Sequence, residues 1–194
     1  YHDNRYFASA KHQGIPKAGY TKIVENMLNS DNIEVRLNTS FKDIESEIEG
    51  VKVIYTGPID ELLNYELGVL PYRSLRFEAE WTDQDLRYAV VNEADKDIPY
   101  TRTHDYKYYQ IHQPEVLASK KSYVCKEYPA DYEVGKEAYY PVNNAESEAL
   151  YQKYLDLLKE RYPNIILGGR LGAYRYWDMD VAIKNALELA ATLE

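Results

Sequence analysis

The stretch GGRLGAYRYWDMDVAIKNALELA (residues 168–190) decides the fold that this sequence predicts. A short apolar strand at 164–167 runs into the two glycines, and an aromatic and basic run follows Arg170. Asp178 then opens a helix, because apolar residues after it recur at helical spacing: Met179, Ile183, Ala186, Leu187 and Ala190. A strand, glycines and a helix N-terminus together present unpaired backbone N–H groups to an anion. The tail therefore predicts half of a nucleotide site.

Length and charge bound the class of protein. The 194 residues suit one domain, or one domain plus a fragment, and can bury a real core. A net charge of −9 argues against general nucleic-acid binding, which needs clustered Lys and Arg. The single Cys125 excludes an internal disulfide and predicts a reducing, cytoplasmic location. No run reaches the ~18 apolar residues of a membrane helix and no signal peptide is recognisable. A first residue of Tyr1 rather than Met indicates a fragment.

Tyrosine is unusually frequent, with 21 Tyr against 3 Phe. Its ring is apolar and its hydroxyl forms hydrogen bonds. Two interpretations stay open: a sheet with solvent-exposed faces, or a cleft that stacks rings and binds phosphates or sugars.

The local patterns predict an α+β fold with an antiparallel β-sheet and flanking helices. Helices are expected at 20–29, 59–65, 143–162 and from Asp178, and strands at 33–37, 51–55, 74–81, 86–92, 100–106, 123–128 and 164–167. No long helix separates the middle strands, which favours antiparallel neighbours over crossovers. The 74–81 strand should bury its apolar face, with Trp81, like Trp177, in packing. Asn143 and Glu146 have capping-box spacing.

Several catalytic motifs are absent from the sequence. No GxGxxG follows an N-terminal strand, and no nucleophile elbow occurs. His104 and His112 are too isolated to suggest a metal site, so no bound metal is expected.

Eight short runs occur in a specific order, although each alone is weak. They are DNRYF (3–7), QGIPKAGYTK (13–22), IYTGPID (54–60), YRSLRFE (72–78), IPYTR (98–102), KEYP (126–129), YYPVNN (139–144) and GGRLGAYRYWDMD (168–180). In these runs the chain resembles the UDP-galactopyranose mutase family, over the C-terminal half of the family's length. Residues 111–121 match none of the runs and are expected to be an insertion at the sheet edge.

The resemblance implies a fragment of a flavoenzyme that lacks the Rossmann segment with its glycine fingerprint. The family interconverts UDP-galactopyranose and UDP-galactofuranose through an adduct between N5 of reduced FAD and the sugar, without net redox. The implied setting is cytoplasmic nucleotide-sugar metabolism for surface polysaccharide and the cell wall, with a homodimeric full-length enzyme. The truncated chain alone is expected to be inactive.

The resemblance also implies an organisation in four parts. These are a loop remnant at 1–20, a FAD-domain-associated α/β segment at 20–70, an antiparallel substrate sheet at 71–142, and a helix, strand and flavin-contacting helix at 143–194. The last part would be the C-terminal strand–helix piece of a FAD-binding α/β domain. The apolar face of its final helix is expected to be exposed.

Matching positions imply roles for individual residues. Arg102 would be catalytic by approaching the substrate diphosphate, which a guanidinium can bind bidentately. Arg170 would be catalytic beside the flavin, where its charge favours the anionic reduced form. The implied substrate-binding residues are Tyr6, Asn92, Arg102, Glu127, Tyr140 and Tyr176. The implied cofactor-binding residues are Gly169, Arg170, Tyr176, Asp178 and Met179.

The residues alone leave other roles open. Arg102 could pair with a carboxylate on a strand face. Arg170 could lie at the surface beside a helix, the tyrosines could pack in the core, and Asp178 could act only as an N-cap. Two other functions also stay open: a redox flavoenzyme of the amine-oxidase type, and a stand-alone UDP-sugar-binding module.

Overall fold

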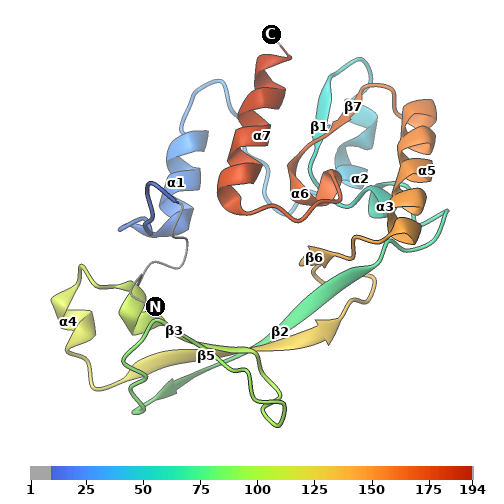
Figure 1. Cartoon of the computed structure of the whole chain (residues 1–194). Helices are drawn as coiled ribbons and strands as arrows, with labels where there is room; N and C mark the ends of the chain where they lie inside the picture. The colour runs from blue at the N-terminus through green and yellow to red at the C-terminus, as the bar shows by residue number, and fades with distance from the viewer. Residues whose placement is uncertain (1–9, 194) are drawn as a thin grey trace. The chain divides into compact units, whose positions relative to one another are not determined.

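The computed structural model describes residues 10–193 of the chain, so Tyr6 lies outside the described residues. Its helices are α1 (Gly19–Leu28), α2 (Phe41–Ile44), η1 (Glu45–Glu47), α3 (Ile59–Leu62), η2 (Tyr106–Tyr109), α4 (Pro114–Leu117), α5 (Ala145–Arg161), α6 (Gly169–Gly172) and α7 (Met179–Ala191). Its strands are β1 (Val53–Tyr55), β2 (Tyr72–Thr82), β3 (Val90–Asn92), β4 (Arg102–Asp105), β5 (Ser122–Asp131), β6 (Tyr140–Pro141) and β7 (Ile165–Leu167). Figure 1 shows them coloured along the chain.

The chain forms two compact units, and each is described by itself. The first unit contains residues 10–37 and 78–126 of the described chain. The second contains residues 38–77 and 127–193.

The larger sheet has five strands in the order β3-β4-β5-β2-β6. In the first unit, β3 pairs antiparallel with β4, which sets Asn92 opposite Arg102. In the second unit, β2 pairs antiparallel with β6, which sets Arg73 opposite Tyr140. A separate two-stranded sheet pairs β1 in parallel with β7. The predicted α+β class, with an antiparallel sheet and flanking helices, is confirmed.

The core of the second unit is rich in tyrosine. It gathers Ile59, Leu62, Leu63, Leu70, Tyr72, Tyr151, Tyr154, Leu158, Ile165 and Tyr174. The Tyr154 hydroxyl donates to the Gly68 carbonyl at 2.6 Å, and the Tyr151 hydroxyl donates to the Gly172 carbonyl at 2.9 Å. A buried tyrosine is stable where its hydroxyl has such a partner. Part of the tyrosine excess therefore builds the core of this unit.

The long helix α5 begins one residue later than its predicted capping box. The Asn144 side chain, rather than that of Asn143, accepts a hydrogen bond from the Ser147 N–H at 2.8 Å. This bond satisfies one of the unpaired donors in the first turn. The Asn143–Glu146 prediction is wrong because position N3 holds Ser147, so no acidic side chain completes a box there.

Residues 33–37 do not form the predicted strand. Ile33, Val35 and Leu37 are 43%, 50% and 79% exposed. Alternating apolar residues form a stable strand only where a partner strand and a covering layer exist. No described strand pairs with this segment, which runs as irregular chain and turn.

The predicted buried face of the 74–81 strand is also wrong. Tyr72 and Ser74 are buried at the start of β2, whereas Phe77 is 45% exposed and Trp81 is 69% exposed. Tyr72 is buried because its ring packs against Tyr174 in the core, with centroids 5.3 Å apart. Trp81, which the sequence assigned to packing, lies with its ring centroid 5.1 Å from that of Tyr123 but remains largely exposed.

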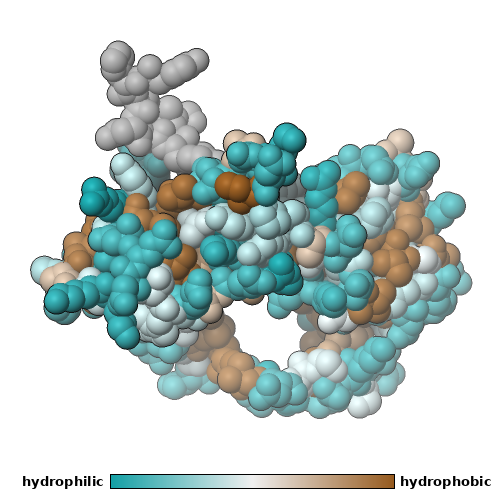
Figure 2. Space-filling model, turned by 90° about the horizontal axis from the view of Figure 1, so that it is seen from below, coloured by the Kyte–Doolittle hydropathy of each residue, from teal (hydrophilic) through white to brown (hydrophobic). Residues whose placement is uncertain are grey.

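Apolar side chains are exposed on α1 and α7. On α7, Met179, Ile183 and Leu187 are 64%, 54% and 68% exposed, which confirms the expected exposure of this face. On α1, Met27 is 63% exposed. Figure 2 shows hydrophobic surface interspersed with hydrophilic surface on the face in view. Within the described part of the chain, no helix is long and apolar enough to cross a membrane.

Candidate functional site

The glycine-rich segment after β7 packs tightly against β1. Gly169 has a φ of +67°, a conformation that side chains with a Cβ rarely adopt. A Cβ at Gly172 would lie 2.9 Å from the carbonyl oxygen of Tyr55. Because that neighbour is backbone, the helical turn α6 can approach β1 this closely only with glycine at residue 172.

The predicted anion site at the tail is organised differently in the structure. The single turn α6 follows the glycines, and α7 begins only at Met179, so residues 173–178 separate the two features. Asp178 occupies the N-cap position of α7, but its side chain makes no capping hydrogen bond within the described residues. The sequence analysis predicted one site from the glycines and this helix start, because the periodicity of apolar residues does not reveal the short turn α6.

Arg170 connects α6 to the strand that carries Tyr140. Its Nη1 donates a hydrogen bond to the carbonyl oxygen of Tyr139. The same side chain lines a cavity of about 380 Å³ that also contacts Glu61, Tyr132 and Lys136. A guanidinium has five donors in a fixed plane, so the bond to Tyr139 orients the group and leaves capacity for a ligand.

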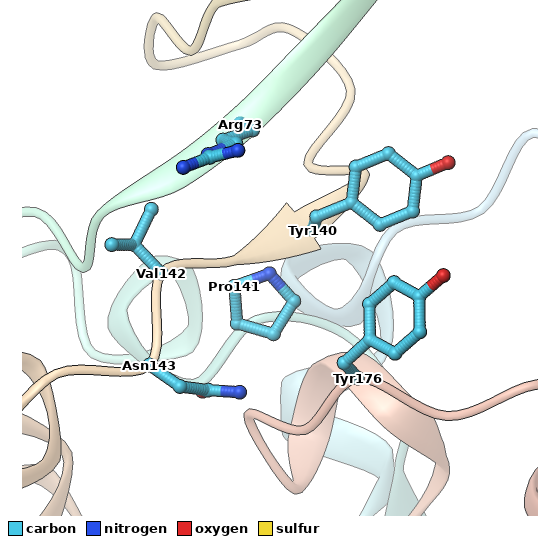
Figure 3. A pocket seen from close by; sticks show the side chains of 6 residues that line it. All are labelled: Arg73, Tyr140, Pro141, Val142, Asn143 and Tyr176. Atoms are coloured by element: carbon cyan, nitrogen blue, oxygen red, sulfur yellow. The ribbon is translucent and has the colours of Figure 1, made fainter.

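Tyr140 and Tyr176 form one wall of a second cavity, of about 480 Å³. Their ring centroids lie 5.4 Å apart with an interplanar angle of 31°. Figure 3 shows the two hydroxyls pointing the same way from neighbouring rings. Tyr140 comes from β6 and Tyr176 from the loop between α6 and α7. The structure thus brings together the two tyrosines that the sequence singled out.

The loop that carries Tyr176 is held by the two residues before it. Tyr174 is fully buried at a φ of +50°, and its hydroxyl donates to the Pro71 carbonyl at 2.6 Å. Arg175 forms two hydrogen bonds with Glu148 of α5, at 2.8 and 3.1 Å. An unusual backbone conformation persists only where the surroundings hold it. These anchors leave Tyr176 at the surface, where it is 59% exposed.

Arg73 lines the same cavity and was missed in the sequence analysis. It lies opposite Tyr140 in the β2–β6 register. In the view of Figure 3 its guanidinium extends away from the two tyrosine hydroxyls. Its position in YRSLRFE carries no local signal, because only strand pairing joins residues 73 and 140.

Arg102 and Asn92 form a pair in the first unit. They face each other in the β3–β4 register, and Nε of Arg102 donates to Oδ1 of Asn92 at 3.0 Å. The bond holds the guanidinium along the strand pair. The structure therefore brings these two predicted residues together, within a different unit from the Tyr140–Tyr176 pair.

Glu127 and Met179 belong to neither pair, although the charge of Glu127 acts on Tyr139, the neighbour of Tyr140. Glu127 is buried in β5, 8% exposed. Met179 is exposed at the start of α7. Among residues 10–193, no group of three or more His, Cys, Asp and Glu side chains could hold a metal ion.

Burial raises the pKa of several tyrosines in the second unit. Desolvation raises the pKa of Tyr139 and of Tyr174, and it raises the pKa of Tyr55 to about 12. A tyrosine hydroxyl is protonated near neutral pH even at its ordinary pKa of about 10, so the raised values leave these groups as neutral hydrogen-bond donors.

Fold and site together define an α+β protein whose tyrosine and arginine side chains line open cavities. The family model described as UDP-galactopyranose mutase matches residues 1–176. The chain belongs to the UDP-galactopyranose mutase family.

Named relatives agree with this membership. The chain is 39% identical over 193 residues to "Probable UDP-galactopyranose mutase" of Klebsiella pneumoniae, covering 97% of this chain and 48% of the relative. It is 38% identical to "dTDP-fucopyranose mutase" of Escherichia coli, covering 98% and 50%. It is 36% identical to "UDP-galactopyranose mutase" of Mycoplasma pneumoniae, again covering 98% and 50%. The chain spans about half the length of these curated relatives.

Proposed function

We propose that this chain contributes to a flavin-dependent mutase that interconverts UDP-galactopyranose and UDP-galactofuranose. The observation that carries the proposal is the Tyr140–Tyr176 pair, whose hydroxyls point the same way from the wall of one cavity. Family membership supports the reaction class. The pair would bind the diphosphate of the substrate.

Neutral hydroxyls suit a diphosphate that must leave the sugar and return to it. A hydrogen bond from a neutral donor is weaker than one from a charged donor, so it binds without trapping the leaving group. For Arg102 of the first unit, the family resemblance alone supports a charged contact with phosphate, which a guanidinium can bind bidentately as negative charge develops. Its bond to Asn92 would fix the plane of the guanidinium. Glu127 and Tyr6 would complete the substrate residues.

FAD in its reduced form is the proposed cofactor, and when bound it would supply the nucleophile that takes the anomeric carbon from UDP. The Arg170 side chain fits the ring of reduced flavin. Its guanidinium is oriented by the hydrogen bond to Tyr139 and offers positive charge to an anionic ring. Gly169, Tyr176, Asp178 and Met179 would lie along the same cofactor. The close packing of α6 on β1 explains on its own why residues 169 and 172 are glycines, without a cofactor.

A second candidate substrate is dTDP-fucopyranose. The Escherichia coli relative that carries this name is 38% identical, against 39% for the Klebsiella pneumoniae relative. A one-point difference does not separate the two sugars. Both candidates share the diphosphate chemistry assigned to Arg102, Tyr140 and Tyr176.

Two alternatives noted in the sequence make different predictions. An amine-oxidase-type flavoenzyme would oxidise an amine and consume oxygen. The proposed diphosphate roles of Arg102, Tyr140 and Tyr176 argue against this alternative. A stand-alone UDP-sugar-binding module would bind its ligand without flavin.

For the mutase we further propose a cytoplasmic location, a homodimer and a role in surface polysaccharide and cell-wall synthesis, supported by the family resemblance.

The test is a mutase assay on the complete product of the gene that encodes this chain. The protein would be incubated with FAD, dithionite and UDP-galactofuranose, and in parallel with dTDP-fucopyranose, and the products separated by chromatography. Formation of UDP-galactopyranose supports the main proposal. Turnover of only the dTDP-sugar supports the second candidate, and flavin retention without turnover of either sugar would overturn both.

A further inference from the structure

The first unit contains an exposed aromatic strip that the proposed mutase site does not use. Trp81 of β2 and Tyr123 of β5 lie with ring centroids 5.1 Å apart, and Tyr106 lies 5.9 Å from Tyr123. Trp81, Tyr106 and Tyr123 are 69%, 43% and 38% exposed. Three adjoining large rings with uncovered surface indicate a recognition surface rather than a core.

The strip forms a wall of a cavity of about 420 Å³. This volume is within the range of small-molecule sites, which are about 300–1,000 Å³. Another part of the wall comes from Glu115 and Val116 of α4. That helix lies within residues 111–121, outside the sequence runs that carry the family resemblance. The cavity is therefore a feature of this chain's own loop as well as of its sheet.

The charged groups around the cavity are mixed in sign. Lys107 is buried, and its Nζ lies 3.5 Å from Oδ2 of Asp85 and donates to the Ser119 carbonyl at 3.4 Å. This ammonium is thus partly neutralised by a carboxylate. Glu115 adds a negative charge to the lining and Lys121 a positive one. A balanced set of charges favours a neutral ligand over a phosphorylated one, because Glu115 would repel phosphate.

We propose that this cavity binds the ring of a neutral hexopyranose. A pyranose has a face of C–H groups that can lie on the Trp81 and Tyr123 rings, and a rim of hydroxyls that both donate and accept hydrogen bonds. Glu115 and Gln110 offer acceptors at the lining, and Lys121 and Gln110 offer donors. The site does not depend on the proposed mutase function and would bind a sugar without flavin.

Tryptophan fluorescence gives a direct test, because the chain has two Trp. In the variant Trp177→Phe only Trp81 reports, and the protein is titrated with methyl β-D-galactopyranoside. We expect a saturable change in emission with a dissociation constant on the order of 1 mM, since a small ligand makes few contacts. No saturable change up to fiftyfold above that concentration, in a protein shown to be folded by circular dichroism, overturns the proposal.

Ligand-detected saturation-transfer NMR then locates the binding. Trp81→Ala should weaken methyl galactoside binding more than tenfold, and Glu115→Gln severalfold. Tyr88→Ala is the matched control, because Tyr88 is 68% exposed and lies outside the residues found to line the cavity. Unchanged binding in Trp81→Ala overturns the site. Displacement of the sugar by uridine monophosphate in the Tyr140→Phe protein overturns the choice of a neutral ligand.

Discussion

Arg175 binds Glu148 through two hydrogen bonds, Nη1 to Oε2 at 2.8 Å and Nη2 to Oε1 at 3.1 Å. The pair ties the loop before Tyr176 to α5, and hydrogen bonding to Arg175 holds the pKa of Glu148 below its usual 4.5. A lowered carboxyl pKa contributes stability above pH 4.5 that is lost as pH falls through the folded value.

Glu148→Gln should therefore lower the free energy of unfolding near neutral pH and have little effect in acid. Both side chains are about 40% exposed, so the loss should stay within about 1 kcal/mol. Urea unfolding at pH 7 and at pH 3 measures the difference. Glu188→Gln is the control, because its contact with Lys184 is looser, at 3.7 Å. A loss of equal size at both pH values would contradict the ion-pair explanation.

Tyr140→Phe and Tyr176→Phe should each weaken nucleotide-sugar binding by about 0.5–1.5 kcal/mol, the net value of one hydrogen bond. Phenylalanine keeps the ring contact and removes only the hydroxyl. Titration calorimetry with UDP checks both variants, with Tyr20→Phe on α1 as the control. If UDP affinity is unchanged in both, the two hydroxyls do not face the diphosphate.

Arg102→Ala should abolish turnover while the protein keeps its flavin, because the side chain is assigned to the diphosphate rather than to the cofactor. Asn92→Ala should have a smaller effect, since it removes the hydrogen bond that orients Arg102. The mutase assay and the visible absorption spectrum are read on the same samples, with Arg36→Ala as the control. Normal turnover in Arg102→Ala would contradict the assignment of Arg102 to the diphosphate.

The sequence predicted the elements whose patterns depend on local chemistry. Helix α5 and strands β1, β5 and β7 all occur close to their expected positions. The strand at 33–37 failed because its alternation has no pairing partner among the described strands. The face of Trp81 was assigned wrongly because a strand pattern shows which residues share a face, not which face is covered.

The sequence predicted which residues belong to the candidate site, and the structure showed which of them lie next to each other. The Tyr140–Tyr176 and Arg102–Asn92 pairs were composed of predicted residues. Arg73 was not predicted, because its place beside Tyr140 comes from the β2–β6 register alone.

Gly172→Ala should destabilise the fold by about 1–3 kcal/mol, the usual cost of overpacking. The new Cβ would lie 2.9 Å from the Tyr55 carbonyl oxygen, so α6 would have to move away from β1. Gly14→Ala is the matched control, because a Cβ there meets nothing within 4 Å. Thermal unfolding compares the two, and equal melting temperatures would show that α6 does not pack this tightly on β1.

Asp60→Asn should stabilise the fold at neutral pH, because the amide is uncharged and so avoids the cost of burying an ionised carboxylate. Asp60 is fully buried, its Oδ2 accepts from the Leu70 N–H at 2.8 Å, and its Oδ1 has no partner within the described residues.

Burial raises the pKa of Asp60, which means that its ionisation opposes folding. Stability is greatest below the unfolded pKa and falls as pH rises through the raised folded value, so the advantage of the Asp60→Asn variant should grow from about pH 4 upward and then level off. Urea unfolding between about pH 4 and pH 8 measures this trend, with the exposed Asp156→Asn as the control. A wild-type protein that gains stability over the variant as pH rises would show that the buried carboxylate is favoured by its hydrogen bonds instead.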